Sequence, residues 1–116
     1  MKIQEIDDAG VMVLAPSGRI DTTTSGAVEE AVRRTVDGGA RRLVIDFASV
    51  EYISSAGLRV LIEARKRARE WKLADMERGD VRIVNLPQRI KEVFELTGFT
   101  SLFQIYDDLV EAVGSF

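Results

Sequence analysis

Two short segments at the beginning of the chain differ in their pattern of hydrophobic and polar residues from the turn between them. Residues 2–6 mix polar and apolar positions, residues 11–16 are apolar, and the turn-forming residues 7–10 separate them. Two such runs joined by a short Asp- and Gly-containing turn predict a β-hairpin. Pro16 and Gly18 interrupt the second strand, and residues 19–21 lead into a Thr-rich stretch.

Three largely apolar segments predict further strands. Residues 43–47 are apolar almost without interruption, which indicates a central strand buried on both faces. Residues 81–85 and 102–106 predict two more strands. Residues 72–80 have mixed periodicity, which fits either a frayed extension of the preceding helix or a loop.

Apolar residues at helical spacing predict four helices between and after these strands. The first ends at Gly38 and Gly39, the second runs from the Ser54–Ser55 corner to about Trp71, and the third has Pro87 in its first turn and closes at Thr97–Gly98. Asp107 or Asp108 can cap the short fourth helix. The apolar stripes consist of Val28, Ala31, Val32 and Val36; Leu58, Leu61, Ile62 and Ala68; Ile90, Val93, Phe94 and Leu96; and Leu109, Val110 and Val113.

These elements follow one another in the order ββαβαβαβα, which predicts a single α/β domain over residues 1–116 with a mixed sheet packed against amphipathic helices. With 116 residues, of which 46% are hydrophobic, the chain can bury a core without disulfides or a metal ion. There is neither a signal peptide at the N-terminus nor an apolar run of about 20 residues, so we expect a cytoplasmic protein without membrane insertion.

Composition excludes several functional classes. The chain has no Cys and no His, which excludes thiol chemistry, Ser-His catalysis and the usual zinc ligands, while a magnesium site made of carboxylates stays open. The net charge of −3 gives no footprint for nucleic acid, and the basic run 65–69 is flanked by Glu63 and Glu70, as expected for a solvated helix face. No phosphate-binding loop or nucleophile elbow is present, so we expect no enzyme and no cofactor.

The candidate chemistry lies where a strand meets the second helix, at Ser54 and Ser55. A serine at a helix N-terminus lies beside unpaired backbone N–H groups and the positive end of the helix dipole, where a phosphoryl group is well tolerated. The residues alone favour a simpler interpretation, in which Ser55 caps the helix. Gly57 fits close packing of helix and strand, and Thr22 to Thr24 fit a capping turn.

With these residues in view, the chain resembles a STAS domain of the bacterial anti-sigma factor antagonist type over nearly its whole length. Residues 52–58 are similar to the family's strand-to-helix motif of apolar residues, Asp, Ser, a small residue, Gly and Leu. Residues 18–21 are similar to a Gly-x-Leu-Asp motif after the second strand. Residues 95–99, followed by Leu102 and Phe103, are similar to the family's late helix end and strand.

The resemblance implies a phosphorylation switch. It places Ser55 at the serine that an anti-sigma factor serine kinase phosphorylates in such proteins. The unphosphorylated form binds the kinase and frees its sigma factor, phosphorylation breaks the complex, and a serine phosphatase resets it. Independently of the resemblance, Asp21 would lie across from Ser55 if the two strand ends share one rim, and there it would repel the phosphate or contact the metal of the incoming nucleotide. The expected partner-binding residues are Asp21, Thr22, Ser54, Ser55, Ala56, Gly57, Arg59 and Glu63.

Two departures from the family pattern stand out. Ser54 occupies the place where the family usually carries Asp, which makes Ser54 an alternative phosphate acceptor. Residues 71–79 form a longer stretch than the short loop of most relatives, and Trp71 fits either a helix-end packing residue or an exposed partner anchor. A second function also stays open, because STAS-like domains also occur as non-catalytic subunits of transporter ATPase complexes and as stress-sensing scaffolds.

Overall fold

A five-stranded mixed sheet forms the centre of the computed structural model, which describes residues 1–70 and 79–116. The strand order is β1-β2-β4-β6-β7, in which β1 and β2 are antiparallel and the other neighbours are parallel. Its strands are β1 (Ile3–Asp8), β2 (Val11–Pro16), β4 (Arg42–Asp46), β6 (Asp80–Val84) and β7 (Ile105–Tyr106). The predicted α/β class and mixed sheet are confirmed.

A second, two-stranded sheet lies beside the first and was not predicted as separate strands. It consists of β3 (Gly18–Ile20) and β5 (Val50–Ile53), which run parallel. Both strands are short, and each follows a longer strand closely in the chain, so the alternation pattern shows no independent period for them. Two of the residues that the sequence analysis selected as the site, Asp21 and Ser54, directly follow these two strands.

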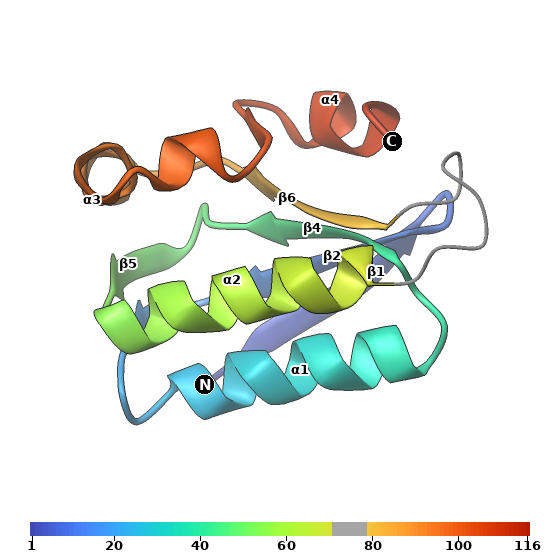
Figure 1. Ribbon diagram of the computed structural model, residues 1–116, viewed down its shortest axis with the longest axis horizontal. Coiled ribbons are helices and arrows are strands. Elements are labelled where there is room, and N and C mark those ends of the chain that lie inside the picture. Colours follow the sequence, from blue (N-terminus) through green and yellow to red (C-terminus); the bar gives the residue numbers. More distant parts are fainter. Residues whose placement is uncertain (71–78) are drawn as a thin grey trace.

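The helices cover the two faces of the main sheet unequally (Figure 1). Helices α1 (Ser25–Asp37) and α2 (Ser55–Arg69) pack side by side on one face, and the short α4 (Leu109–Gly114) covers the other. Helix α3 (Gln88–Thr97) and the 3-10 helix η2 (Phe99–Ser101) close one end. None of the helices in the described ranges is both long enough and apolar enough to span a membrane.

The alternation of side chains along the central strands explains the two cores. In β4, Leu43 and Ile45 face the larger core under α1 and α2, whereas Val44 faces the smaller core under α4. All three are essentially inaccessible to solvent. The continuous apolar run therefore forms a central strand buried on both faces, as predicted.

Several details of the predicted helices and strands are wrong. Leu96 was assigned to the buried stripe of the third helix but is 88% exposed, and Val110 on the fourth helix is 80% exposed. In α2, Ile62 is only half-buried and Ala64 is buried instead. The last strand is shortened to Ile105–Tyr106, because the chain is still turning at residues 102–103 after the 3-10 helix Phe99–Ser101.

The ends of the helices agree better with the sequence. Gly98 closes α3 in the left-handed conformation that favours glycine, with φ of 78°. Asp108, rather than Asp107, caps α4 by accepting a hydrogen bond of 2.7 Å from the amide of Val110. Helix α2 is observed to Arg69. The predictions for Trp71 and the stretch that follows it lie outside the described residues.

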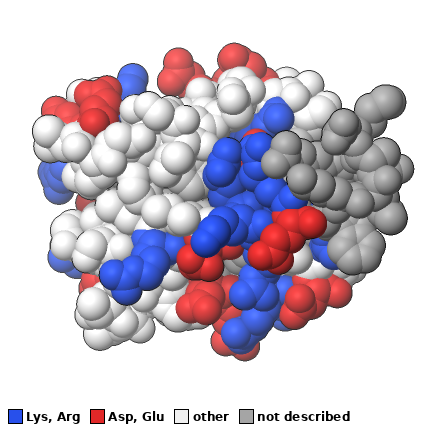
Figure 2. Space-filling view, viewed as in Figure 1, with Lys and Arg blue, Asp and Glu red and all other residues white. Residues whose placement is uncertain are grey.

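Charges of both signs are mixed on the surface over α1 and α2, whereas the upper left of the same view is largely uncharged (Figure 2). Lys and Arg side chains lie next to Asp and Glu side chains across the middle of this face. The described part of the chain contains no group of three or more acidic side chains that could hold a metal ion.

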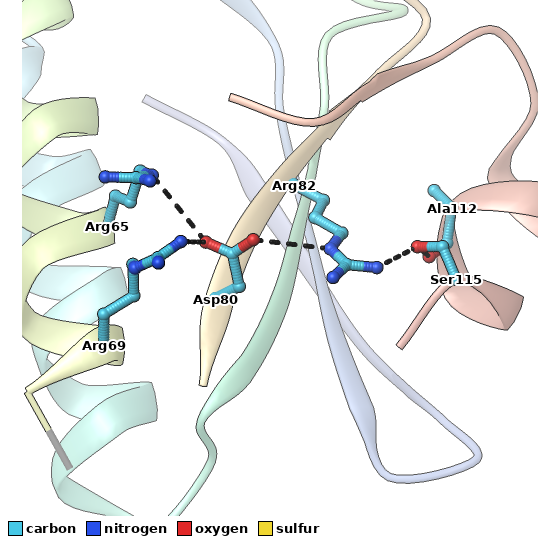
Figure 3. A network of polar contacts seen from close by, with 6 residues as sticks. All are labelled: Arg65, Arg69, Asp80, Arg82, Ala112 and Ser115. Carbon is cyan, nitrogen blue, oxygen red and sulfur yellow. Dashed lines mark hydrogen bonds and ion pairs between the residues drawn. The ribbon is translucent and has the colours of Figure 1, made fainter. Parts of the chain in front are cut away.

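A buried carboxylate fixes the C-terminal half of α2 to the sheet (Figure 3). Asp80, at the start of β6, is 8% exposed and lies 3.8 Å from the nearest nitrogen of Arg65 and 3.5 Å from that of Arg69. Its second oxygen is 3.4 Å from Nε of Arg82. Arg82 in turn donates to the hydroxyl of Ser115 near the C-terminus. This network, which we call the Asp80 cluster, joins α2, β6 and the residues after α4, and the sequence analysis did not find it.

Candidate phosphorylation and partner-binding site

The two short strands bring two distant segments of the chain together at one point. In the parallel pair β3–β5, Ile20 is the partner of Ile53, and the amide of Ser54 donates a 2.8 Å hydrogen bond to the carbonyl of Ile20. Asp21 and Ser54 therefore leave their strands side by side. The proposed sharing of one rim by these strand ends, on which a role for Asp21 depends, is thus present in the structure.

Ser54 is the residue that caps α2. Its backbone is extended, with φ of −90° and ψ of 173°, and its Oγ accepts a 3.2 Å hydrogen bond from the amide of Gly57. Its carbonyl accepts the first helical bond, from the amide of Leu58 at 2.9 Å. The side chain is half-buried. Capping was expected to fall on Ser55, and this assignment is wrong because the chain enters the helix one residue earlier.

Ser55 is the first residue inside the helix, and its side chain is exposed. Its hydroxyl forms no hydrogen bond with any of the described residues, unlike that of Ser54. Because Gly57 is capped, the amides of Ser55 and Ala56 are the first-turn donors that have no helical acceptor. The exposed hydroxyl thus lies at the positive end of a helix of 15 residues.

Gly57 holds the beginning of α2 close to the small sheet. A Cβ atom at this position would lie 2.7 Å from side-chain carbons of both Ile20 and Ile53 and 3.3 Å from the carbonyl oxygen of Ile20. These distances leave no space for a side chain, and Gly57 is buried. The packing interpretation is therefore supported, and any effect of Gly57 on a partner acts through the position of the helix.

Asp21 organises the turn before α1. Its Oδ1 accepts hydrogen bonds from the hydroxyl and the amide of Thr23, at 2.7 and 2.9 Å, and from the amide of Thr24 at 3.2 Å. These bonds, above all the one from the Thr23 hydroxyl, lower the pKa of Asp21. Thr22 is exposed in the same turn. The predicted turn exists, and Asp21 enters the site as a charged group with a fixed orientation.

A shallow groove between α1 and α2 begins next to Ser55. Its volume is about 290 Å³. Helix α2 contributes three of the predicted partner-binding residues, and α1 contributes two residues that the sequence analysis missed, since the spacing of apolar residues does not show which helices pack together. The groove is lined by Ser25, Glu29, Ala56, Arg59, Val60 and Glu63.

The other flank of the site carries an exposed aromatic side chain. Tyr52, on β5, is 39% exposed, and the guanidinium carbon of Arg19 lies 4.2 Å from the centre of its ring. Such a cation–π contact keeps both side chains at the surface without burying either. The sequence analysis placed Tyr52 in the motif but gave it no role, although an aromatic residue next to a candidate site is a common anchor in interfaces.

Several known proteins are similar to this chain in sequence. The STAS domain model matches residues 1–112. The chain is 32% identical over 108 residues to the anti-sigma-F factor antagonist RsfB of Mycobacterium tuberculosis, covering 92% of this chain and 82% of RsfB.

Solved structures give the same result for the fold. An anti-sigma factor antagonist from Mycobacterium paratuberculosis superposes with a TM-score of 0.83 at 29% identity, covering 98% of this chain and 92% of that one. The Bacillus cell fate determinant SpoIIAA in its phosphorylated form shares the fold with a TM-score of 0.69 at 14% identity, covering 98% of each chain. The chain belongs to the STAS domain family.

Proposed function

We propose that this chain is a cytoplasmic anti-sigma factor antagonist that binds a kinase-type anti-sigma factor and is switched off by phosphorylation of Ser55. The observation that carries the proposal is that the two serines differ in exposure and hydrogen bonding. Ser54 is half-buried and its hydroxyl is used by the helix cap, whereas the hydroxyl of Ser55 is exposed and unused by the described residues. The relative RsfB, itself named an anti-sigma-F factor antagonist, supports the same function.

The switch acts on the surface and leaves the fold unchanged. A phosphoryl group adds about −1.5 to −2 charges and three acceptor oxygens. At Ser55 these oxygens meet the free amides of the first helical turn and the positive end of the helix dipole, so they cause little strain. The partner, in contrast, must then desolvate a fixed negative charge, which weakens the complex. Removal of the phosphate by a serine phosphatase restores binding.

Ser54 stands where the family usually carries Asp, and its structural role suggests what replaces the carboxylate. A serine hydroxyl caps a helix about as well as Asp does, so the beginning of α2 is preserved. Ser54 does not supply the negative charge that an Asp would bring to this position. The neighbouring acidic side chain is that of Asp21, which follows the paired strand β3 and begins the turn before α1. We therefore assign to Asp21 the role of positioning the partner or the metal of its nucleotide.

The test is incubation with ATP and the kinase-type anti-sigma factors encoded in the same genome, followed by intact mass measurement and site mapping. We expect one phosphate, on Ser55. Ser55→Ala should remain unmodified and stay bound to the kinase, while Ser54→Ala serves as the matched control that still accepts phosphate. Phosphate found only on Ser54 or within Thr22 to Thr24 would refute the assignment.

Ser55→Asp separates the surface effect from a structural one. Because Ser54 provides the cap, this substitution loses no capping bond, and a carboxylate at the helix N-terminus contributes about 0.3–1 kcal/mol of stability. Thermal melting should therefore be unchanged or slightly improved, whereas a binding titration should show a weaker complex. A large drop in melting temperature would identify Ser55 as a structural residue instead.

The partner-binding face is tested by charge reversal. Arg59 lines the groove, and Lys66 lies two turns further along α2; both are exposed. Glu111 is exposed on α4, on the opposite face of the sheet. Reversing Arg59 and Lys66 together should weaken kinase binding, and reversing Glu111 should change it little. The opposite result would place the partner on the α4 face.

A further inference from the structure

Arg59 is an exposed cation close to the candidate phosphorylation site. It lies four residues after Ser55 on α2 and is exposed. Glu63 follows one turn later and Glu29 lines the same groove, yet Arg59 forms no ion pair with either of them or with any other described residue. Arg65 and Arg69 of the same helix differ, because Asp80 holds both.

The geometry of an α-helix brings residues 55 and 59 together. Side chains four residues apart lie on the same face, with Cβ atoms about 5–6 Å apart, and long side chains lean toward the N-terminus of the helix. An anion followed by a cation four residues later is also the more favourable order. A guanidinium in this position can donate two parallel hydrogen bonds to a phosphate group.

We propose that Arg59 is the phosphate-binding residue of the phosphorylated protein. Its guanidinium pairs with the phosphate on Ser55, together with the free amides of Ser55 and Ala56, and so leaves the groove between α1 and α2. This inference rests on the proposed function, since it requires a phosphate on Ser55. It adds a second consequence of phosphorylation.

The movement of Arg59 changes the groove as well as the site. Two carboxylates, those of Glu29 and Glu63, and one guanidinium line the groove in the unmodified protein. When the phosphate takes the guanidinium, the lining of this groove keeps two carboxylates and no cation, and Arg67 stays beside both carboxylates in the adjoining pocket. A partner that fits the unmodified groove therefore meets a new anion at Ser55 and also loses a cation beside it. A single modification thereby alters two adjacent parts of the docking surface.

The experiment installs phosphoserine at position 55 of the full chain by genetic encoding, so that it needs no kinase. The second pKa of the phosphate is then measured by phosphorus NMR in the parent protein and in Arg59→Gln, Arg59→Lys and Lys66→Gln. A neighbouring cation favours the doubly charged phosphate and lowers this pKa. We expect the pKa to be about 0.3–0.7 units higher in Arg59→Gln than in the parent.

The other variants define the controls. Arg59→Lys should keep part of the effect, since it preserves the charge but not the planar fork. Lys66→Gln removes another exposed cation, which lies three turns from Ser55, and should titrate like the parent. Asp21, Glu29 and Glu63 are the same in every variant, so their effect on the phosphate cancels. The difference between parent and Arg59→Gln should also shrink in 1 M salt, where charges are screened over about 3 Å.

Two outcomes distinguish this inference from the proposed function. If Arg59→Gln titrates like the parent, Arg59 does not bind the phosphate, even where a kinase modifies Ser55. If the installed phosphate shows the Arg59 effect but no anti-sigma factor kinase modifies Ser55, the phosphate-binding residue is correct and the proposed function is wrong.

Discussion

The two ends of α2 differ in how their polar groups are used. At the C-terminal end, Arg65 and Arg69 are held by the buried carboxylate of Asp80, which also contacts Arg82. At the N-terminal end, the hydroxyl of Ser55 and the guanidinium of Arg59 are exposed and have no partner among the described residues. The same helix is therefore anchored at its C-terminal end, which Figure 3 shows, and chemically available at its N-terminal end.

This difference explains how a site can change charge without loss of structure. A phosphate or carboxylate added at Ser55 acts on a surface that has few contacts to lose. The position of the helix depends on buried groups, namely Gly57 against Ile20 and Ile53 and the Asp80 cluster at the far end. Substitutions in the anchoring groups should thus affect stability, and those in the available groups should affect binding.

The largest effect is expected at Asp80. Asp80→Asn keeps the shape of the side chain but leaves three guanidinium groups around a neutral amide. Removing one member of a buried charge network typically costs about 3–5 kcal/mol. The four side chains of the cluster are 12% to 29% exposed, so solvent partly screens their charges and reduces this cost. We therefore expect a loss of about 2–4 kcal/mol in the free energy of unfolding, measured by urea denaturation.

Glu5→Gln is the matched control for Asp80→Asn. It removes the 2.9 Å ion pair with Arg34, in which both side chains are well exposed. Exposed ion pairs contribute about 0–1 kcal/mol. An equal, small loss in both variants would mean that solvent already screens the Asp80 cluster and that it does not anchor α2.

Gly57→Ala should produce the next largest effect. The new Cβ would lie 2.7 Å from carbons of Ile20 and Ile53, so the helix has to move away from the small sheet. Overpacking of this kind costs about 1–3 kcal/mol, which exceeds the gain of about 0.5–1 kcal/mol expected from replacing a helical Gly. We therefore expect a lower free energy of unfolding and weaker partner binding, because Ser55 moves with the helix.

Gly26→Ala distinguishes the crowding at Gly57 from a general effect of glycine. Gly26 lies in the first turn of α1, and a Cβ there would meet nothing within 4 Å. This variant should be neutral or more stable by up to about 1 kcal/mol. If Gly57→Ala were also stabilising, Ile20 and Ile53 would have made room for the new methyl group. The close contact at Gly57 would then not determine the position of α2.

The same comparison shows which features sequence can predict. The central strands and the buried stripes of α1 and α2 follow from the periodicity of apolar residues, and the beginning of α2 follows from the Ser-Ser-Ala-Gly sequence. The partner of Asp80 could not be predicted, since Arg65 and Arg69 are 15 and 11 residues away in the chain and reach it only when α2 packs on β6. The basic run 65–69 was assigned to a solvated face for this reason.

Exposure was also predicted unevenly. The helical period predicted that Leu96 is buried. However, α3 packs at one end of the domain and buries only the side of the helix that carries Ile90 and Phe94. A helix that touches the core along a narrow strip leaves apolar residues of its period in solvent. The capping serine was predicted one residue too late, at Ser55 instead of Ser54. An error of one residue is usual when the end of a helix is predicted from sequence.

Ser54→Ala and Ser55→Ala form a closely matched pair with a smaller expected effect. Ser54→Ala removes the hydroxyl that accepts from the amide of Gly57 and should cost about 0.5–2 kcal/mol. Ser55→Ala removes a hydroxyl without a hydrogen bond to the described residues and should stay within about 0.5 kcal/mol of the parent. Urea denaturation of both variants measures the difference. A greater loss for Ser55→Ala would transfer the structural role to Ser55.

The smallest effect concerns the pH dependence of the Asp21 turn. Hydrogen bonds from Thr23 hold the pKa of Asp21 below its ordinary value of about 3.9. Because the folded-state pKa is lowered, the contribution of these bonds is fully present above about pH 3.9 and is lost as the pH falls through the folded-state value. Asp21 is only half-buried, so this loss should be slight. A carbon NMR titration should give a midpoint below that of an unfolded Asp, and Thr23→Ala should raise it, because both the hydroxyl bond and part of the order of the turn are lost. If Thr23→Ala leaves the midpoint unchanged, the orientation of the Asp21 carboxylate beside the site does not depend on Thr23.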